Sequence, residues 1–235
     1  MFNAIKTSLV VALAIMLASG LVQAADCGPT PDAGTPPLDY RTAPQETLRT
    51  VEKFHFTADV EALRRGQSSE SIGRDLEFVL TYFPNHARAL NALLRLAKRE
   101  KSERPGGLTD SVDCWFDRAI QFRADDSAVR LLHALWLVHG KDRAAATQAL
   151  EVARKTAPAN SANYFYNLGL GYLEVGDTDR ALEAAHRAYA LGYPLPGLRE
   201  RLRKLGKWKP AVEAPAVQQD APAPVQGAPA GSPAR

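Results

Sequence analysis

Two cysteines and five histidines carry the most reactive side chains of this chain, and their spacing argues against catalysis. Cys27 and Cys114 are far too distant in sequence to form the C-x-x-C pair of a redox enzyme. There is no H-E-x-x-H motif, and no two histidines lie four residues apart, as zinc ligands on one helix face would. The histidines are His55, His86, His133, His139 and His186. We therefore expect neither a thiol–disulfide enzyme nor a zinc hydrolase.

Other motifs that could carry chemistry have simpler structural explanations. The sequence contains no G-x-S-x-G motif. The Gly-Leu-Gly at residues 169–171 lies inside a predicted helix, where glycines serve close packing rather than phosphate binding. The Asp-Asp at residues 125–126 matches a helix start, and a calcium site would need more oxygen ligands at fixed intervals. We expect no catalytic residue, no bound metal and no cofactor.

The elements that must position these residues follow a helical repeat. The pattern F-x2-L-G-x2-Y, then A-x3-A-x2-A and a proline, is typical of a helix–turn–helix unit of about 34 residues. It is formed by Phe165, Leu168, Gly169, Tyr172, Ala181, Ala185, Ala188 and Pro194. The same skeleton occurs one unit earlier, at Leu132, Trp136, Leu137, Gly140, Ala145, Ala149 and Pro158. Because such a unit cannot bury its apolar face alone, it predicts neighbours of the same kind.

The second helix of each unit is the easier half to trace. Apolar residues spaced by four and then three positions keep one helical face apolar. They are Ile72, Leu76 and Val79; Val112, Phe116 and Ala119; Ala145, Ala149 and Val152; and Ala181, Ala185 and Ala188. The first helices are less regular. Leu90, Leu93, Leu94 and Ala97 fit the second unit, whereas a first helix with Phe56, Val60 and Leu63 is ended early by Gly66, with Thr57 as its candidate cap.

Residues 162–194 closely resemble a tetratricopeptide repeat, as do residues 127–158, while residues 86–124 and 56–84 resemble it more loosely. The resemblance implies an all-α fold over residues 45–208, an α-solenoid in which helix pairs form a right-handed superhelix. A basic segment at residues 196–208 is predicted to be a C-terminal capping helix with its polar face outward. The alternative is a generic bundle of alanine-rich helices.

In tetratricopeptide proteins the first helices line a concave groove in which a bound peptide lies. The resemblance places groove positions at Arg88, Asn91, Arg95, Lys98 and Arg99; at Arg130, Leu131 and Ala134; and at Asn163, Tyr166, Asn167, Leu170 and Glu174. Arginine can grip a carboxylate bidentately, and asparagine can pair with the amides of an extended peptide. This chemistry suits an acidic or C-terminal peptide segment, and a solvated helix face is the alternative.

The ends of the chain predict export and two segments of low order. Residues 1–24 resemble a secretory signal, with Lys6, an apolar run at residues 9–17 and small residues before Ala25; an uncleaved anchor is the alternative. Cys27 lacks the preceding leucine of a lipoprotein signal, so we do not expect lipidation. Residues 25–44 are a proline-rich lead-in, and residues 209–235 are predicted to be a disordered tail, either passive or a docking strand.

Export bears on the two cysteines and on the location of the protein. An oxidising compartment permits a Cys27–Cys114 bridge, which would staple the lead-in to the helices and contribute about 4 kcal/mol in the chain-entropy model. Two unpaired thiols are the alternative. The signal and the repeats together predict a periplasmic protein, with an extracellular one as the alternative, and no later segment could cross a bilayer.

Net charge is modest, at +3, but cations cluster at the C-terminal end of the predicted helical domain. There Leu198, Leu202 and Leu205 keep helical spacing among Arg199, Arg201, Arg203, Lys204, Lys207 and Lys209. Membrane-surface or nucleic-acid binding would need such a cluster, but export argues against nucleic acid and we favour a solvated cap. We therefore expect a non-catalytic scaffold in the cell envelope, binding a protein or peptide segment during assembly of an envelope complex. The alternative is a permanent structural subunit of a secretion, pilus or polysaccharide-export machine.

Overall fold

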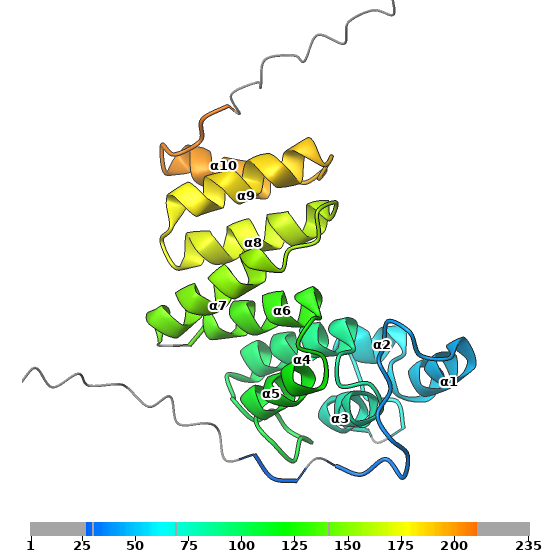
Figure 1. The fold of residues 1–235 in the computed structure, drawn as a ribbon. Coiled ribbons are helices and arrows are strands. Elements are labelled where there is room, and N and C mark those ends of the chain that lie inside the picture. Colours follow the sequence, from blue (N-terminus) through cyan, green and yellow to red (C-terminus); the bar gives the residue numbers. More distant parts are fainter. Residues whose placement is uncertain (1–26, 30, 69, 141, 211–235) are drawn as a thin grey trace, which may run out of the picture. The chain divides into compact units, whose positions relative to one another are not determined.

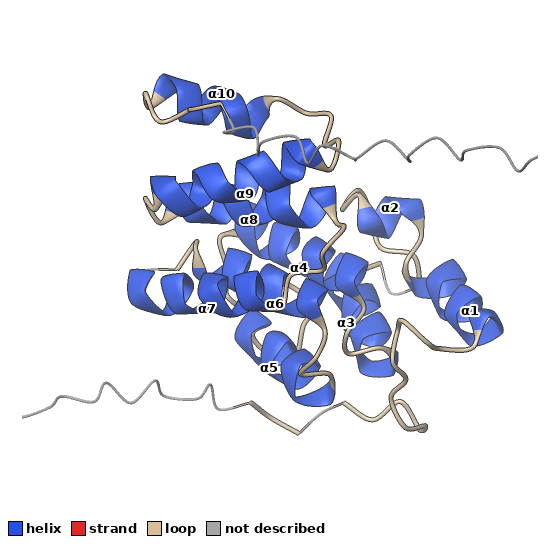
Figure 2. Cartoon of the chain, turned by 45° about the horizontal axis from the view of Figure 1, so that its top comes forward, coloured by secondary structure: helices blue, strands red, loops and turns tan. Residues whose placement is uncertain are grey.

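The computed structural model describes residues 27–29, 31–68, 70–140 and 142–210. The predicted signal at residues 1–24 and the predicted tail from residue 211 onward lie outside this part of the chain. The described residues form ten α-helices and no strand, which confirms the all-α class (Figure 1, Figure 2). None of these helices combines the length and the apolar composition needed to span a bilayer.

The chain divides into two compact units, residues 1–129 and 130–235, with the boundary inside one helix. The helices of the first unit are α1 (Gln45–His55), α2 (Ala58–Glu61), α3 (Ile72–Tyr82), α4 (Ala87–Glu100) and α5 (Val112–Phe122). The boundary falls in α6 (Ser127–Leu137). The second unit continues with α7 (Arg143–Lys155), α8 (Ala162–Glu174), α9 (Thr178–Ala190) and α10 (Gly197–Lys204).

Polar side chains start most of these helices. In six of the described helices the N-cap side chain accepts a hydrogen bond from a backbone N–H three residues on, satisfying a donor that the helix itself leaves free. These caps are Ser71, His86, Ser111, Asp142, Ser161 and Asp177. Short loops end at these capped helix starts, and the helices that they join, α3 with α4 and α8 with α9, pack against each other.

The predicted buried faces of three second helices agree with the structure. Leu76 and Val79 of α3, Phe116 and Ala119 of α5, and Ala181, Ala185 and Ala188 of α9 are each 0% exposed. The prediction for α7 is wrong by one position, because the helix buries Ala146, Leu150 and Ala153 and leaves Val152 37% exposed. Residues 144–146 are all alanine, so their spacing does not show which side of the helix is buried. Leu150 faces the core because it has the larger apolar side chain.

The short first helix predicted around Phe56, Val60 and Leu63 is present and these three residues are buried, but the helix is shorter than predicted. Only one turn forms there, α2, and the chain leaves it through Leu63, whose φ of +58° lies in the left-handed region. Thr57 precedes α2, but its side chain makes no cap hydrogen bond. The helix that packs on α3 in this position is α1, which begins at Gln45 and was not predicted as a separate element.

Small residues allow the helices of the second unit to approach closely. A Cβ atom at Gly169 of α8 would lie 2.6 Å from a methyl carbon of Leu198, and one at Gly171 would lie 2.7 Å from a methyl carbon of Leu150. The same core contains Leu168, Tyr172, Ala181, Ala185 and Leu202. The C-terminal helix is shorter than predicted, because α10 ends at Lys204 and Gly206 turns the chain with a φ of +66°.

Candidate binding surfaces

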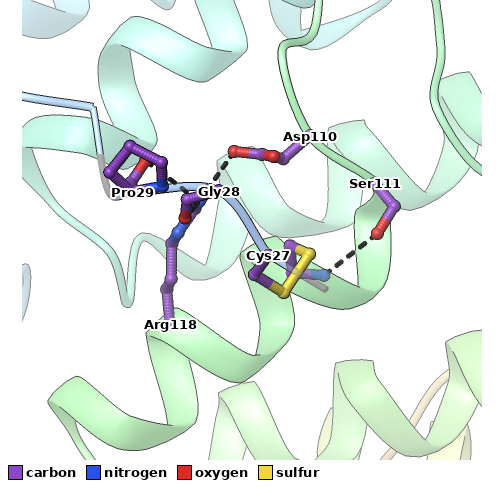
Figure 3. The surroundings of a disulfide bond; sticks show 7 residues. Cys27, Gly28, Pro29, Asp110, Ser111 and Arg118 are labelled. Carbon is purple, nitrogen blue, oxygen red and sulfur yellow. Dashed lines mark hydrogen bonds and ion pairs between the residues drawn. A yellow bond between two sulfur atoms is a disulfide. The ribbon is translucent and has the colours of Figure 1, made fainter. Parts of the chain in front are cut away.

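The predicted disulfide between Cys27 and Cys114 is confirmed (Figure 3). It joins residues 87 positions apart with their Cα atoms at 5.4 Å, and it ties the lead-in to α5. The Cys114 residue is 2% exposed. Both sulfur atoms are engaged in the bridge, so neither cysteine carries a free thiol.

Arg118 of α5 reinforces the attachment beside the bridge (Figure 3). Its Nη2 donates to the carbonyl oxygen of Gly28 at 2.8 Å and to Asp110 Oδ2 at 2.7 Å. Its guanidinium lies over the ring of Trp115, 4.7 Å from the centroid, and the Arg118 side chain is only 9% exposed. The lead-in is therefore fastened at its start, in contrast to the low order predicted for it.

A buried amide fastens the other end of the lead-in. Asn85, which is 0% exposed, donates through Nδ2 to Asp39 Oδ1 at 2.7 Å and to Asp126 Oδ2 at 2.9 Å. Its Oδ1 accepts from the backbone N–H of Tyr40 at 2.9 Å. A bidentate contact from Arg41 and the Asn85 hydrogen bond hold the pKa of Asp39 well below its usual range. These contacts attach residues 39–41 to the helices of the first unit.

The basic face of α4, predicted as part of a peptide groove, is occupied by the α2 segment. Arg88 pairs with Glu61, the Arg95 guanidinium donates to the Glu61 carbonyl oxygen, and Arg99 Nη1 donates to the Leu63 carbonyl oxygen at 2.5 Å. The Arg88 hydrogen bonds hold the pKa of Glu61 below its ordinary value. Three of the arginines predicted to line a peptide groove therefore already bind this chain. The remaining predicted residues, Asn91 and Lys98, are exposed on α4.

His86 lies beneath this face, fully buried at the start of α4. Its Nδ1 accepts from the backbone N–H of Ala89 at 3.1 Å, which leaves Nε2 to donate to Glu52 Oε1 at 3.2 Å. Its ring packs against Tyr40 and Phe56. Burial, with a contribution from Arg88, lowers the pKa of His86 from 6.5 to about 4. The folded unit therefore holds a neutral imidazole at pH 7.

The predicted groove residues of α8 lie together on one accessible face. Asn163 is exposed. Asn167 Nδ2 donates to the carbonyl oxygen of Asn163 at 2.9 Å and to Asn163 Oδ1 at 3.1 Å. Tyr166 stacks on Tyr193 with ring centroids 4.0 Å apart, and Leu170 is half-buried. In the described part of the chain, no hydrogen bond engages Asn167 Oδ1 or Asn163 Nδ2. The pair therefore presents one acceptor and one donor outward.

Three other predicted groove residues, one on α8 and two on α6, are engaged within the chain or buried. Glu174 is engaged by Arg201 of α10, whose Nη2 lies 2.7 Å from its Oε1. In α6, Leu131 is 6% exposed and Ala134 is 0% exposed, because both belong to the core of the second unit. Arg130 is half-buried on the same helix. We call the remaining residues, Asn163, Tyr166, Asn167 and Leu170, the α8 polar face.

An aromatic groove between α1 and α3 was not predicted. Phe54 is 50% exposed and Phe78 is 38% exposed, and with His55 and Tyr82 they line a cavity of about 430 Å³. Phe78, His55 and Tyr82 also line a second cavity of about 730 Å³. His55 stacks on Phe78 at 3.7 Å, and its Nδ1 lies 3.0 Å from Oδ1 of the buried Asp75. Sequence spacing contains no signal for this groove, since it depends on α1 packing against α3.

A third cavity, which is mainly apolar, lies in the second unit, over α7, α8 and α9. It has a volume of about 480 Å³, an apolar floor that includes Phe165 and Leu168, and a rim containing Arg154 and Arg180. Both arginines pair with Glu151, which also accepts a hydrogen bond from Tyr172 at 2.6 Å. Burial and this hydrogen bond raise the pKa of Tyr172. Arg187 also lines the cavity, where it donates to the Ala159 carbonyl oxygen and lies over the ring of Phe165.

Among the described residues, no group of three or more histidine, cysteine, aspartate or glutamate side chains is arranged to hold a metal ion. Comparison of the chain with protein-family models, with curated proteins and with solved structures found no match.

Proposed function

We propose that this chain is an exported, non-catalytic protein-interaction scaffold of the tetratricopeptide type, which binds an extended segment of a partner protein on the α8 polar face. The observation that carries the proposal is the outward-facing amide pair of Asn163 and Asn167, flanked by Tyr166 and Leu170. An asparagine side chain can both donate to and accept from a peptide backbone, as the edge of a sheet does. The neighbouring aromatic and aliphatic groups would contact the side chains of the bound segment.

Several features of the fold support the assignment to a helical repeat. The α8–α9 pair places Gly169 and Ala181 at close contacts, as the repeat pattern predicts. Leu198 and Leu202 of α10 are fully buried while its arginines and lysines are largely exposed, as expected of a capping helix. The Cys27–Cys114 bridge is compatible with an oxidising compartment, which favours a periplasmic or extracellular location.

A peptide-display selection against the full chain tests the function. We expect the enriched peptides to lose at least about tenfold in affinity for an Asn163→Ala/Asn167→Ala variant, because two backbone hydrogen bonds are removed. An Arg64→Ala/Arg65→Ala variant is the matched control, since those side chains bind only Asp59 and neighbouring backbone in the first unit. Peptides that bind both variants equally well would place the interaction elsewhere, and failure to enrich any peptide would count against a peptide-binding scaffold.

The aromatic groove supports the second candidate, a permanent structural subunit of an envelope machine. Exposed aromatic side chains that gather at one place commonly mark a permanent interface. Under this alternative, Phe54→Ser/Phe78→Ser should increase the solubility of the isolated chain and prevent its incorporation into a complex. The scaffold proposal predicts instead that the isolated chain is soluble without a partner and that this variant leaves peptide binding on α8 unchanged.

A further inference from the structure

The C-terminal end of α10 presents cations and an apolar side chain on an ordered turn. Residues 204–209 read Lys-Leu-Gly-Lys-Trp-Lys, and we call them the lysine turn. The backbone N–H of Lys207 donates to the Leu202 carbonyl oxygen at 2.8 Å, and that of Gly206 donates to Arg203 at 2.9 Å. This pair of hydrogen bonds, with a left-handed glycine, is the Schellman ending of a helix. These hydrogen bonds therefore order the backbone from which the side chains of the lysine turn project.

Some cations of α10 and the lysine turn contact other side chains, whereas others form no ion pair in the described part of the chain. Arg201 pairs with Glu174, and Arg199 lies over the rings of Tyr189 and Trp208. The three lysines of the lysine turn, Lys204, Lys207 and Lys209, are exposed, and none forms an ion pair within the described part of the chain. From residue 197 to residue 209 the sequence carries six cations against one acidic residue, so the positive charge is not balanced locally.

The apolar groups of the lysine turn lie among these lysines. Leu205 is 57% exposed, the largest exposure of any large hydrophobic side chain in the described residues. Trp208 is half-buried, with its ring edge-on to His186 at 5.2 Å and to Tyr189 at 6.0 Å. Lysine, leucine and tryptophan together are the residues that favour a bilayer interface, where ammonium groups meet phosphates and apolar groups enter the acyl boundary.

We propose that the lysine turn docks on the surface of an anionic phospholipid bilayer. Charge complementarity places Lys204, Lys207 and Lys209 at the headgroup phosphates, and Leu205 enters the interface beside them. An acidic protein could also meet the lysines, but it would not require an exposed leucine at the centre of the cluster. The attachment is reversible, because each lysine near an anionic surface strengthens binding only about fivefold. It would hold the scaffold at a membrane without using the α8 polar face.

Vesicle co-sedimentation of the full chain tests this proposal. The probes are vesicles of phosphatidylcholine alone and of equal parts phosphatidylcholine and phosphatidylglycerol. We expect stronger binding to the anionic vesicles, weakened by added salt. A Lys204→Glu/Lys207→Glu/Lys209→Glu variant should bind them at least about tenfold more weakly. Residues 1–26 are common to all variants, so any membrane affinity of the apolar run at residues 9–17 cancels in the comparison.

Three further variants keep the test specific. Lys53→Glu/Arg104→Glu/Lys155→Glu makes the same change in net charge at exposed positions elsewhere and should alter binding less than about threefold. Leu205→Ser keeps every charge and should still weaken binding. Brominated lipids should quench the fluorescence of Trp208, and a Trp208→Phe variant should lose that quenching. Thermal unfolding confirms that each variant is folded, as expected for exposed substitutions.

Three results would overturn the proposal. The first is equal binding to both kinds of vesicle, and the second is an equal loss in the Lys53/Arg104/Lys155 variant. The third is binding to polyglutamate that depends on the lysine turn, without quenching of Trp208 by brominated lipid, which would identify an acidic-protein site instead.

Discussion

The outward faces of α4 and α8 occupy equivalent positions in two of the predicted repeat units, yet the structure uses them differently. On α4, Arg88, Arg95 and Arg99 bind a side chain and two backbone carbonyls of the α2 segment. On α8, the amide groups of Asn163 and Asn167 bond to each other and keep a donor and an acceptor outward. A charged helix face is therefore weaker evidence for a ligand than a polar face whose groups remain unused.

The same contrast extends to what holds each unit together. The first unit is fastened by a disulfide, a buried asparagine and ion pairs that connect segments distant in sequence. The second unit is held mainly by small residues that bring helices into close contact, as at Gly169 and Gly171. Covalent and ionic ties compensate in the first unit for an irregular lead-in and a one-turn helix. We expect perturbations to separate the two units accordingly.

The largest effect should come from the disulfide. A Cys27→Ser/Cys114→Ser variant should lose about 4 kcal/mol of unfolding free energy in the first unit, because the loop of 87 residues is no longer closed in the unfolded chain. Hydrogen exchange followed by mass spectrometry should show faster exchange in α3–α5 and little change in α8 and α9. Equal loss of protection in both units would mean that they unfold as one and would contradict the contrast.

Acid should act next most strongly, and through His86. Its pKa of about 4 in the folded state lies below the ordinary value of 6.5. The free energy of unfolding therefore keeps its full value above pH 6.5. It falls by about 3 kcal/mol as the pH drops from 6.5 towards 4, because the unfolded chain binds a proton that the buried ring does not. Denaturation at a series of pH values should show this slope in the first unit. His86→Asn keeps a capping acceptor but does not titrate, so its profile over this range should be flatter, and an unchanged slope would assign the effect to another group.

Overpacking should act on the second unit alone. Gly169→Leu places its Cβ 2.6 Å from Leu198 and forces α10 outward, with an expected loss of about 1–3 kcal/mol. Urea denaturation and exchange at α8–α10 measure it. The exposed Ala144→Leu is the matched control and should change stability by less than about 0.5 kcal/mol. If the two variants melt alike, close packing at Gly169 does not hold this unit.

The ion pair at the α2 segment should have a smaller effect. Arg88→Ala should cost about 1 kcal/mol or less, because the pair with Glu61 is largely solvent-exposed. We expect faster amide exchange in α2 with little change in global stability. Protection of α2 that is unaffected by this variant and by Arg95→Ala would show that these arginines do not hold the segment, and the α4 face would again be a candidate surface.

The smallest effect on stability is expected at the α8 polar face. Asn163→Ala/Asn167→Ala removes an exposed hydrogen bond between neighbouring turns and should change stability by less than about 0.5 kcal/mol. Thermal unfolding measures this directly. A large destabilisation would mean that the amide pair serves the fold, and it would then be poor evidence for a binding surface.

Local patterns predicted the parts of the fold in which residue size and spacing agree. The repeat around Phe165 and Tyr172 predicted the α8–α9 pair, and Ala181, Ala185 and Ala188 are buried as expected. The Cys27–Cys114 bridge was predicted because export to an oxidising compartment was expected, with two unpaired thiols as the alternative. In α7, three consecutive alanines gave no indication of which face of the helix is buried.

Other features could not be predicted because they depend on contacts between distant segments. The bonds from Arg95 and Arg99 go to backbone carbonyls, which carry no sequence signature. Their partners, the carbonyl oxygens of Glu61 and Leu63, lie at the end of the one-turn helix α2, where the helix itself supplies no donor for them. The aromatic groove likewise arises from α1 meeting α3, and nothing in the spacing of Phe54 and Phe78 indicates that both remain exposed.

Photo-crosslinking in living cells tests the central claim most directly. A photoreactive amino acid is placed at Leu170, on the α8 polar face, and in separate strains at Asn91 on α4 and at the exposed Gln148 on α7. We predict one discrete protein adduct at position 170, lost when Asn163 and Asn167 are alanine, and no matching adduct at positions 91 or 148. An adduct at position 91 that survives those alanine substitutions, with none at position 170, would contradict the account.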